Sequence, residues 1–248
     1  MIFDIITLFP SMFQSPFNES IIKRAIDNGI VTINPIQLRD FAHDKHSVTD
    51  DAPFGGGSGM VMKVEPIVNA LKSINALKGE IDREREEVIL LTPQGERFSQ
   101  KIAHELAKKE RVVMVAGRYE GFDERVRENY VTRELSIGDF VMTGGEIAAM
   151  VIIDAVTRLI EGVLGNEESS VEESHANGLL EYAQYTRPAD FMGHKVPDVL
   201  ISGDHKKIDE HRRRDSLKRT LAKRPDLINK NKLSKEALEM LDRLSEEE

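Results

Sequence analysis

Short apolar runs alternate with helical patterns through the middle of the chain. Three such runs predict strands, at Val88–Leu91, Val112–Ala116 and Thr132–Ser136. Apolar residues at helical spacing follow each strand and predict helices over Arg97–Lys109, Asp123–Asn129 and Glu146–Glu161. Strands that alternate with helices in this way predict an α/β fold with a mainly parallel sheet.

The N-terminal part of the chain extends this alternation. It predicts strands over Ile2–Leu8 and Ile30–Leu38, and helices over Phe17–Asn28 and Glu65–Leu77. Between the second strand and the second helix lies Arg39–Met60, a long polar stretch that contains the run GGGSG. Because long internal loops are usually functional or disordered, we interpret it as a substrate-covering loop, with an inert surface loop as the alternative.

Two features of this stretch are candidates for chemistry. His43 and His46 could bind a metal ion, but no third ligand at a defined spacing accompanies them. The GGGSG run is not a phosphate-binding P-loop, because no Gly-Lys-Ser/Thr follows it and Lys63 is displaced. The residues alone therefore predict neither a metal site nor a P-loop.

A loop that contains glycine follows each of the three central strands. The loops are Thr92–Gly95, Gly117–Gly121 and Ser136–Glu146. Ligands of parallel α/β sheets bind beyond the carboxyl ends of the strands, so we expect these three loops to converge on one binding pocket. The fingerprint GxGxxG after the first strand is absent, which disfavours an ordinary dinucleotide site.

Composition narrows the class of protein. The chain has 248 residues, of which 40% are hydrophobic and 31% charged, as in a globular protein of one large or two smaller domains. It has no cysteine, which excludes disulfides, zinc–thiolate sites and thiol nucleophiles and suits a cytosolic protein. The N-terminus lacks the basic region of a signal peptide, and Asp154 interrupts the longest apolar pattern, so we expect no membrane-spanning segment.

Charge is distributed unevenly. The chain has a net charge of −9, yet the stretch 186–224 carries eleven Lys/Arg and six Asp/Glu. It contains the predicted helix Asp204–Lys223, and a second, amphipathic helix is predicted over Ser234–Leu244. A basic stretch on an acidic body suggests contact with an anion such as nucleic acid. A solvated helix face is the alternative.

Six motifs in fixed order identify a family. They are DDAPFGGGSGM (50–60), LTPQG (91–95), GRYEG (117–121), SIGDFVMTGGE (136–146), GVLGNE (162–167) and GLLEYAQYTRP (178–188). From Met1 to about Asp226, this ordered set closely resembles the bacterial tRNA (guanine-N1)-methyltransferases of the SPOUT superfamily. These enzymes methylate the guanosine immediately 3′ of the anticodon.

The resemblance implies an architecture and partners. It implies a SPOUT domain with a trefoil knot that binds S-adenosylmethionine (1–162), a flexible linker (163–180) and a small all-α domain that binds the tRNA anticodon loop and stem (181–248). It also implies a cytoplasmic homodimer with its active sites at the subunit interface. Among the basic residues, we expect phosphate contacts from Lys206, Lys207, Arg212, Arg213, Arg214, Lys218 and Arg219.

The resemblance also assigns site residues. For S-adenosylmethionine it implies Leu91, Pro93, Gly117, Tyr119, Ile137, Gly138, Asp139, Phe140, Val141, Met142, Gly144 and Gly145. Methylation at guanine N1 requires a base for the N1 proton and a cation for the charge that develops at O6. The family pattern assigns these roles to Glu173 and Arg158.

Three points stay open in this assignment. The family has aspartate where this chain has Glu173, so the neighbouring Glu172 is an alternative base. Arg158 could also pair with Asp154 one helical turn earlier. Mg²⁺ is linked with the family, and Glu120 is the position we suspect, although no compact carboxylate cluster supports it.

Ribose 2′-O-methylation and a non-catalytic RNA-binding module with a vestigial pocket are the alternative functions.

Overall fold

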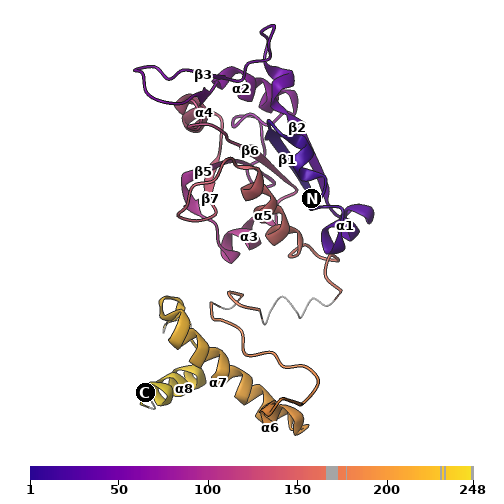
Figure 1. The fold of residues 1–248 in the computed structure, drawn as a ribbon, viewed down its shortest axis with the longest axis vertical. Coiled ribbons are helices and arrows are strands. Elements are labelled where there is room, and N and C mark those ends of the chain that lie inside the picture. The colour runs from indigo at the N-terminus through magenta and orange to yellow at the C-terminus, as the bar shows by residue number, and fades with distance from the viewer. Residues whose placement is uncertain (166–172, 177, 230, 232, 247–248) are drawn as a thin grey trace. The chain divides into compact units, whose positions relative to one another are not determined.

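The computed structural model describes residues 1–165, 173–176, 178–229, 231 and 233–246 (Figure 1). Glu172 therefore lies outside the described residues. The chain divides into two compact units, Met1–Gly165 and Asn166–Glu248, each considered by itself. No helix of the described residues combines the length and the apolar character needed to cross a membrane.

A five-stranded sheet forms the centre of the first unit, and all neighbouring strands in it are parallel. In sheet order the strands are β2 (Thr32–Gln37), β1 (Ile2–Thr7), β6 (Arg111–Ala116), β5 (Glu86–Arg97) and β7 (Arg133–Ser136). This confirms the predicted α/β class.

Helices cover both faces of this sheet. One face packs against α1 (Ser20–Asp27), α3 (Gln100–Leu106) and α5 (Glu146–Thr157), and the other against α2 (Val64–Ser73) and α4 (Glu124–Asn129) (Figure 1). Side chains of a strand alternate between the faces, and in β6 Met114 belongs to the first cluster while Val113 and Val115 belong to the second. Burial on both faces explains why the central strands are short, continuous apolar runs.

Strand β5 is longer than predicted. Leu91 and Glu96 both pair with Leu135 of β7, so the expected loop Thr92–Gly95 is a bulge inside the strand. A Cβ atom on Gly95 would lie 2.5 Å from the backbone nitrogen of Leu135, which only glycine avoids. The predicted helix start at Arg97 was therefore wrong: α3 begins at Gln100, after Ser99 as its N-cap.

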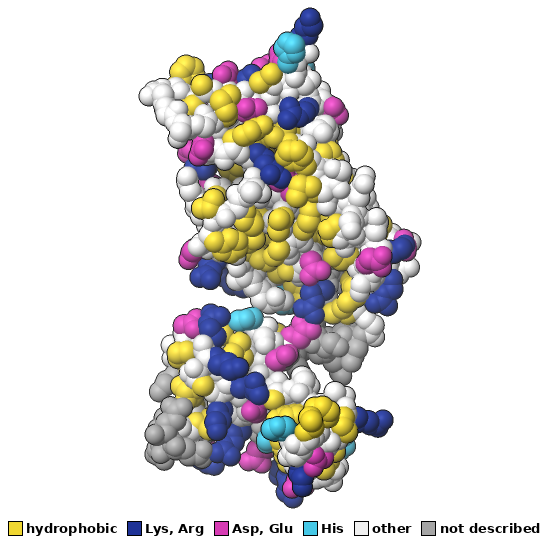
Figure 2. Space-filling view, viewed as in Figure 1, with side chains coloured by type: hydrophobic (Ala, Val, Ile, Leu, Met, Phe, Trp, Pro, Cys, Tyr) yellow, Lys and Arg dark blue, Asp and Glu magenta, His cyan; other side chains and the backbone are white. Residues whose placement is uncertain are grey.

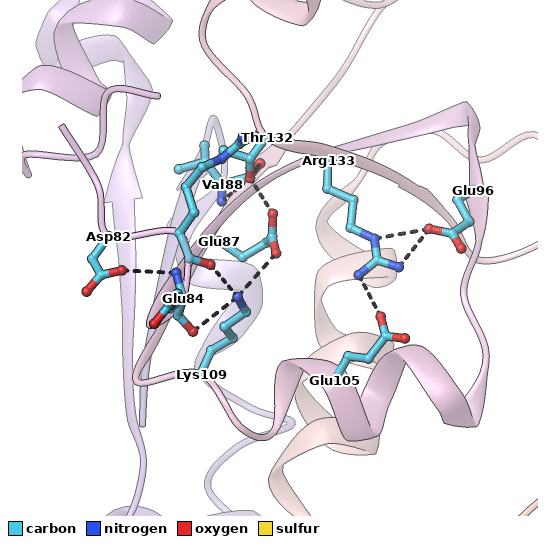
Figure 3. A network of polar contacts seen from close by, with 10 residues as sticks. Asp82, Glu84, Glu87, Val88, Glu96, Glu105, Lys109, Thr132 and Arg133 are labelled. Carbon is cyan, nitrogen blue, oxygen red and sulfur yellow. Dashed lines mark hydrogen bonds and ion pairs between the residues drawn. The ribbon is translucent and has the colours of Figure 1, made fainter. Parts of the chain in front are cut away.

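Polar contacts fix the bulged end of β5 (Figure 3). Arg133 of β7 donates to Glu96 at 2.7 Å and to Glu105 of α3 at 3.1 Å. Burial opposes the charge, but the two carboxylates outweigh it and raise the pKa of Arg133. The contacts join β5, β7 and α3 beside the strand ends on which the site is built.

The polar stretch 39–60 contains little regular secondary structure. It contains a 3₁₀ helix, η2 (Leu38–Phe41), and strand β3 (Asp50–Asp51), which pairs antiparallel with β4 (Val61–Met62). The backbone N–H of Met62 donates to Gly121 at 2.9 Å, and that of Glu120 donates to Met60 at 3.0 Å. This small hairpin is thereby attached to the loop after β6.

Two long helices dominate the second unit. These are α7 (His205–Lys223) and α8 (Lys235–Glu246), which pack through the buried residues Leu217, Leu241 and Leu244. A short helix, α6 (Asp198–Ile201), precedes them. The unit also contains a hairpin that the sequence analysis did not predict, β8 (Asp190–Phe191) with β9 (His194–Lys195). Its two-residue turn has positive φ at both central positions, as a type I′ turn requires.

Candidate functional site

A cavity of about 340 Å³ opens beside the bulge of β5 and the carboxyl ends of β6 and β7. Its walls come from the β5 bulge, the loop after β6 and the loop between β7 and α5. The three glycine-containing segments therefore meet, as the order of the strands predicted. The volume lies within the range of small-molecule sites, about 300–1,000 Å³.

Nearly all of the predicted cofactor residues line this cavity. They are Leu91, Pro93, Gly117, Tyr119, Ile137, Gly138, Phe140, Val141, Met142, Gly144 and Gly145. Asp139 is not among the lining residues: its side chain is 90% exposed, and its carboxylate lies 4.0 Å from the Arg97 guanidinium. The structure brings these eleven lining residues together around one cavity. That each of them binds the cofactor stays a prediction.

Two of the walls, the loop after β6 and the loop between β7 and α5, pass each other in close backbone contact. The backbone N–H of Gly145 donates to the carbonyl of Gly117 at 2.8 Å. A Cβ atom on Gly145 would lie 2.9 Å from the Cα atom of Ala116, closer than real Cβ atoms approach backbone. Glycine is thus required where the chain entering α5 passes the end of β6.

A buried ion pair lies behind this crossing, between two residues that the sequence analysis did not single out. Glu146, in the first turn of α5, is fully buried. One carboxylate oxygen accepts from Arg118 Nε at 3.0 Å, and the other from Thr7 Oγ1 at 2.9 Å. Arg118 also donates to the carbonyl of Thr143 at 3.1 Å and lies over the Phe9 ring. The pair therefore joins β1, the loop after β6 and the loop before α5.

Carboxylates near the cavity do not form a metal cluster. Glu120 and Glu124 are the acidic residues among its lining residues. No group of three or more His, Cys, Asp or Glu suited to a metal ion occurs within the described part of the chain. Mg²⁺ is held by oxygen ligands in octahedral geometry, which these two side chains alone do not supply.

The predicted catalytic residues belong to different units. Arg158 is half-buried at the C-terminal cap of α5, and its backbone N–H donates to Asp154 at 3.3 Å. Glu173 is half-buried in the second unit, and its carbonyl accepts from the backbone N–H of Ala176 at 3.1 Å. The roles of both residues stay predictions.

The basic residues of α7 lie on more than one side of the helix. Lys207, Arg214 and Lys218 are exposed and follow one another at spacings of seven and four residues, so they share one face, the basic face. Lys206 and Arg213 are exposed about a quarter to a third of a turn away from this face. Figure 2 shows Lys and Arg side chains gathered on the visible surface of this unit. On another side of the helix, Arg212 lies over the Tyr182 ring and Arg219 pairs with Asp215 at 2.6 Å. On the basic face, Lys207 pairs with Asp204 at 3.1 Å.

Comparison with known proteins extends over both units. The family model described as tRNA (Guanine-1)-methyltransferase TrmD matches residues 1–230. A tRNA (guanine-N(1)-)-methyltransferase of Dehalococcoides mccartyi (strain CBDB1) is 55% identical over 245 residues, 99% of this chain and 97% of the relative. The enzyme of the same name from Dictyoglomus turgidum is 55% identical over 98% of this chain and 96% of the relative. That of Anoxybacillus flavithermus is 51% identical over 99% and 98%.

Proposed function

This chain belongs to the tRNA (guanine-1)-methyltransferase family, and from that membership we propose that it methylates N1 of the guanosine immediately 3′ of a tRNA anticodon. The proposed methyl donor is S-adenosylmethionine. The observation that carries the proposal is the meeting of three glycine-containing strand ends around one cavity of about 340 Å³. A cavity of this size, lined by both apolar side chains and polar groups, suits a small amphipathic ligand.

Residues of the cavity wall would hold the donor. Leu91 and Ile137 would offer apolar surface, and Gly117 and Gly144 would let the donor approach the backbone closely. The donor supplies an electrophilic methyl group on a positively charged sulfur. The Arg118–Glu146 pair would keep the wall in shape, because it connects the loops that form it.

The reaction needs a base and a cation. The carboxylate of Glu173 would take the N1 proton of guanine as N1 forms its bond to the methyl carbon and the bond from that carbon to sulfur breaks. The Arg158 guanidinium would stabilise the negative charge that develops at O6. Glutamate is one methylene longer than the family aspartate, so the adjacent Glu172 stays the alternative base. A displacement of about 1 Å can cost a large factor in rate.

The second unit would bind the anticodon stem and loop. Basic residues at helical spacing on α7 can meet successive phosphates, which position an RNA without reading its sequence. Recognition of one guanine would then depend on a base turned out of the loop.

A second copy of the chain would complete the first unit. Ile147 and Val151, one turn apart on α5, are 48% and 43% exposed, and Phe140 and Val141 beside the cavity are 55% and 88% exposed. Figure 2 shows hydrophobic side chains gathered over this unit. Apolar surface of this kind marks an interaction site, and we propose a cytoplasmic homodimer with active sites at the interface. The knotted path of SPOUT domains is part of the same proposal.

The test is methylation of unmodified tRNA transcripts that carry guanine or adenine 3′ of the anticodon. We expect the wild type to methylate only the guanine transcript, at N1, and Glu173→Gln to lose about 10²-fold or more in rate. Glu172→Gln is the matched variant and should keep its rate. Full activity in Glu173→Gln would contradict the base assignment. A product methylated on ribose, or donor binding without transfer to any tRNA, would overturn the function.

A further inference from the structure

A short segment of the second unit runs along α7 and is held by side chains of that helix. The segment is Leu180–Ala183, named the strap here. The Leu180 N–H donates to Thr220 Oγ1 at 3.0 Å, and Ser216 Oγ donates to the Leu180 carbonyl at 2.5 Å. The Ala183 N–H donates to the Asp215 carboxylate at 2.6 Å. Both backbone groups of Leu180 are thus bound by α7.

The strap also holds the turn that contains Glu173. The N–H of Glu181 donates to Ser174 Oγ at 3.0 Å, and the N–H of His175 donates to the Leu179 carbonyl at 2.7 Å. Ser174 directly follows Glu173, so two short steps of hydrogen bonding connect the proposed base to α7. The first passes from Ser174 to the strap, and the second from the strap to Ser216 and Thr220.

The strap and the basic face use opposite sides of one helix. Arg214 and Ser216 are two residues apart, which in a helix of 3.6 residues per turn places them on opposite sides. Thr220 is fully buried on the strap side, whereas Lys207 and Lys218 are exposed on the other. A rigid helix therefore carries the phosphate-facing cations and the turn with the carboxylate together.

We infer that Ser216 and Thr220 are positioning residues, which fix Glu173 to the helix that grips the RNA. This rests on the proposed function, in which Glu173 is the base. When RNA binds to α7, the Glu173 carboxylate would be positioned together with the helix. RNA binding would therefore also place the general base. Neither hydroxyl touches the substrate; both act through the strap.

The test uses the full-length protein with Ser216→Ala and Thr220→Val combined. The double variant loses both neutral hydrogen bonds to Leu180 and also the bond from Thr220 Oγ1 to the Ser216 carbonyl within α7. This should loosen the strap and lower the single-turnover rate of methyl transfer about tenfold. Affinity for the tRNA transcript, measured by filter binding, should change less than twofold. Hydrogen exchange should show lost protection at the amides of Leu180 and Glu181. Thr220→Ser in place of Thr220→Val should restore most of the rate.

A matched control is Ser234→Ala, which removes a cap of α8 in the same unit, where Ser234 Oγ accepts from the Ala237 N–H at 3.2 Å. Its transfer rate should equal that of the wild type. An unchanged rate despite lost amide protection would overturn the inference, as would a parallel loss of rate and RNA affinity, which indicates general damage to α7. If the wild type transfers no methyl group, the proposed function fails. Intact amide protection in the double variant would show, independently of activity, that Ser216 and Thr220 do not hold the strap.

Discussion

The cavity of the first unit and the basic helix of the second are held in place by different kinds of contact. The cavity stands at the ends of strands that are buried on both faces, with Met114, Val115 and Ala116 of β6 all fully buried. Helix α7 has 19 residues but buries only Leu217 and Thr220. It packs on α8 through Leu217, and its side chains also hydrogen-bond to the strap.

This difference has a physical consequence. Close-packed interiors transmit small changes in volume or charge, because neighbouring atoms have no room to relax. An exposed helix face is solvated, and its charges are screened by salt within about 10 Å at 0.1 M ionic strength. Substitutions at the cavity should therefore affect stability and ligand binding strongly, whereas those on the basic face should affect only association with an anion.

The largest effect should come from breaking the buried pair. In Arg118→Met the Glu146 carboxylate, whose side chain is 1% exposed, loses its cation, and we expect a loss of about 3 kcal/mol in the free energy of unfolding. Arg85 forms a comparable pair with Glu110 at the surface. Arg85→Met should therefore leave the urea midpoint unchanged. Adding Glu146→Gln to Arg118→Met should recover much of the lost stability. If Arg118→Met and Arg85→Met lowered the urea midpoint equally, the buried pair would be no more important than the surface pair.

The crossing of the two cavity walls should be nearly as sensitive. In Gly145→Ala the new methyl group would meet Ala116 Cα at 2.9 Å and the backbone nitrogen of Gly117 at 3.0 Å. Overpacking of this kind costs about 1–3 kcal/mol, so affinity for S-adenosylmethionine should fall about tenfold in calorimetry. Gly79→Ala is the matched control, since nothing lies within 4 Å of its added Cβ. Donor binding that survives Gly145→Ala would show that this wall is not rigid.

The sequence predicted the strands and the meeting of their loops because both follow from local pattern. An apolar run predicts a buried strand, and the order of strands and helices predicts a common sheet edge. It did not predict that β5 continues past Leu91, because that depends on the register of β7. Nor did it predict the Arg118–Glu146 pair, whose partners are 28 residues apart in sequence. A glutamate in the first turn of a helix already has a local explanation in the helix dipole.

Helical periodicity alone separates the basic residues of α7 by side. Phosphate contacts were predicted for Arg212 and Arg219 together with Lys207 and Lys218, and they stay a prediction, but Arg212 and Arg219 lie on another side of the helix, where they contact Tyr182 and Asp215. Helical periodicity separates these positions, since 207, 214 and 218 share a face that excludes 212 and 219. The strap itself could not be predicted, because nothing local indicates that Leu180 will bind Ser216 and Thr220.

The basic face should respond to salt more than to shape. In Lys218→Ala the slope of log affinity for tRNA against log salt should fall by about one, with a decrease of a few-fold in affinity at physiological salt. Lys101→Ala, at a side chain of the first unit that is 86% exposed, is the charge-matched control and should leave the slope unchanged. Affinities would be measured by filter binding over a series of salt concentrations. The same change in slope for both variants would mean that only total charge matters.

The smallest effect concerns the pH dependence of the stability that Asp215 contributes by holding the strap. Burial opposes the charge of Asp215, but the Ala183 N–H and the Arg219 guanidinium outweigh it and hold the pKa of this carboxyl below its usual value. A lowered pKa in the folded state means that Asp215 stabilises the fold above the ordinary aspartate pKa of about 3.9, and that this contribution disappears as pH falls through the lowered value. Asp215→Asn should therefore be less stable than the wild type by a constant amount from pH 7 to pH 5. Urea unfolding at lower pH should show that difference shrinking, and a difference that persists undiminished at pH 3 would mean that the carboxylate charge does not hold the strap.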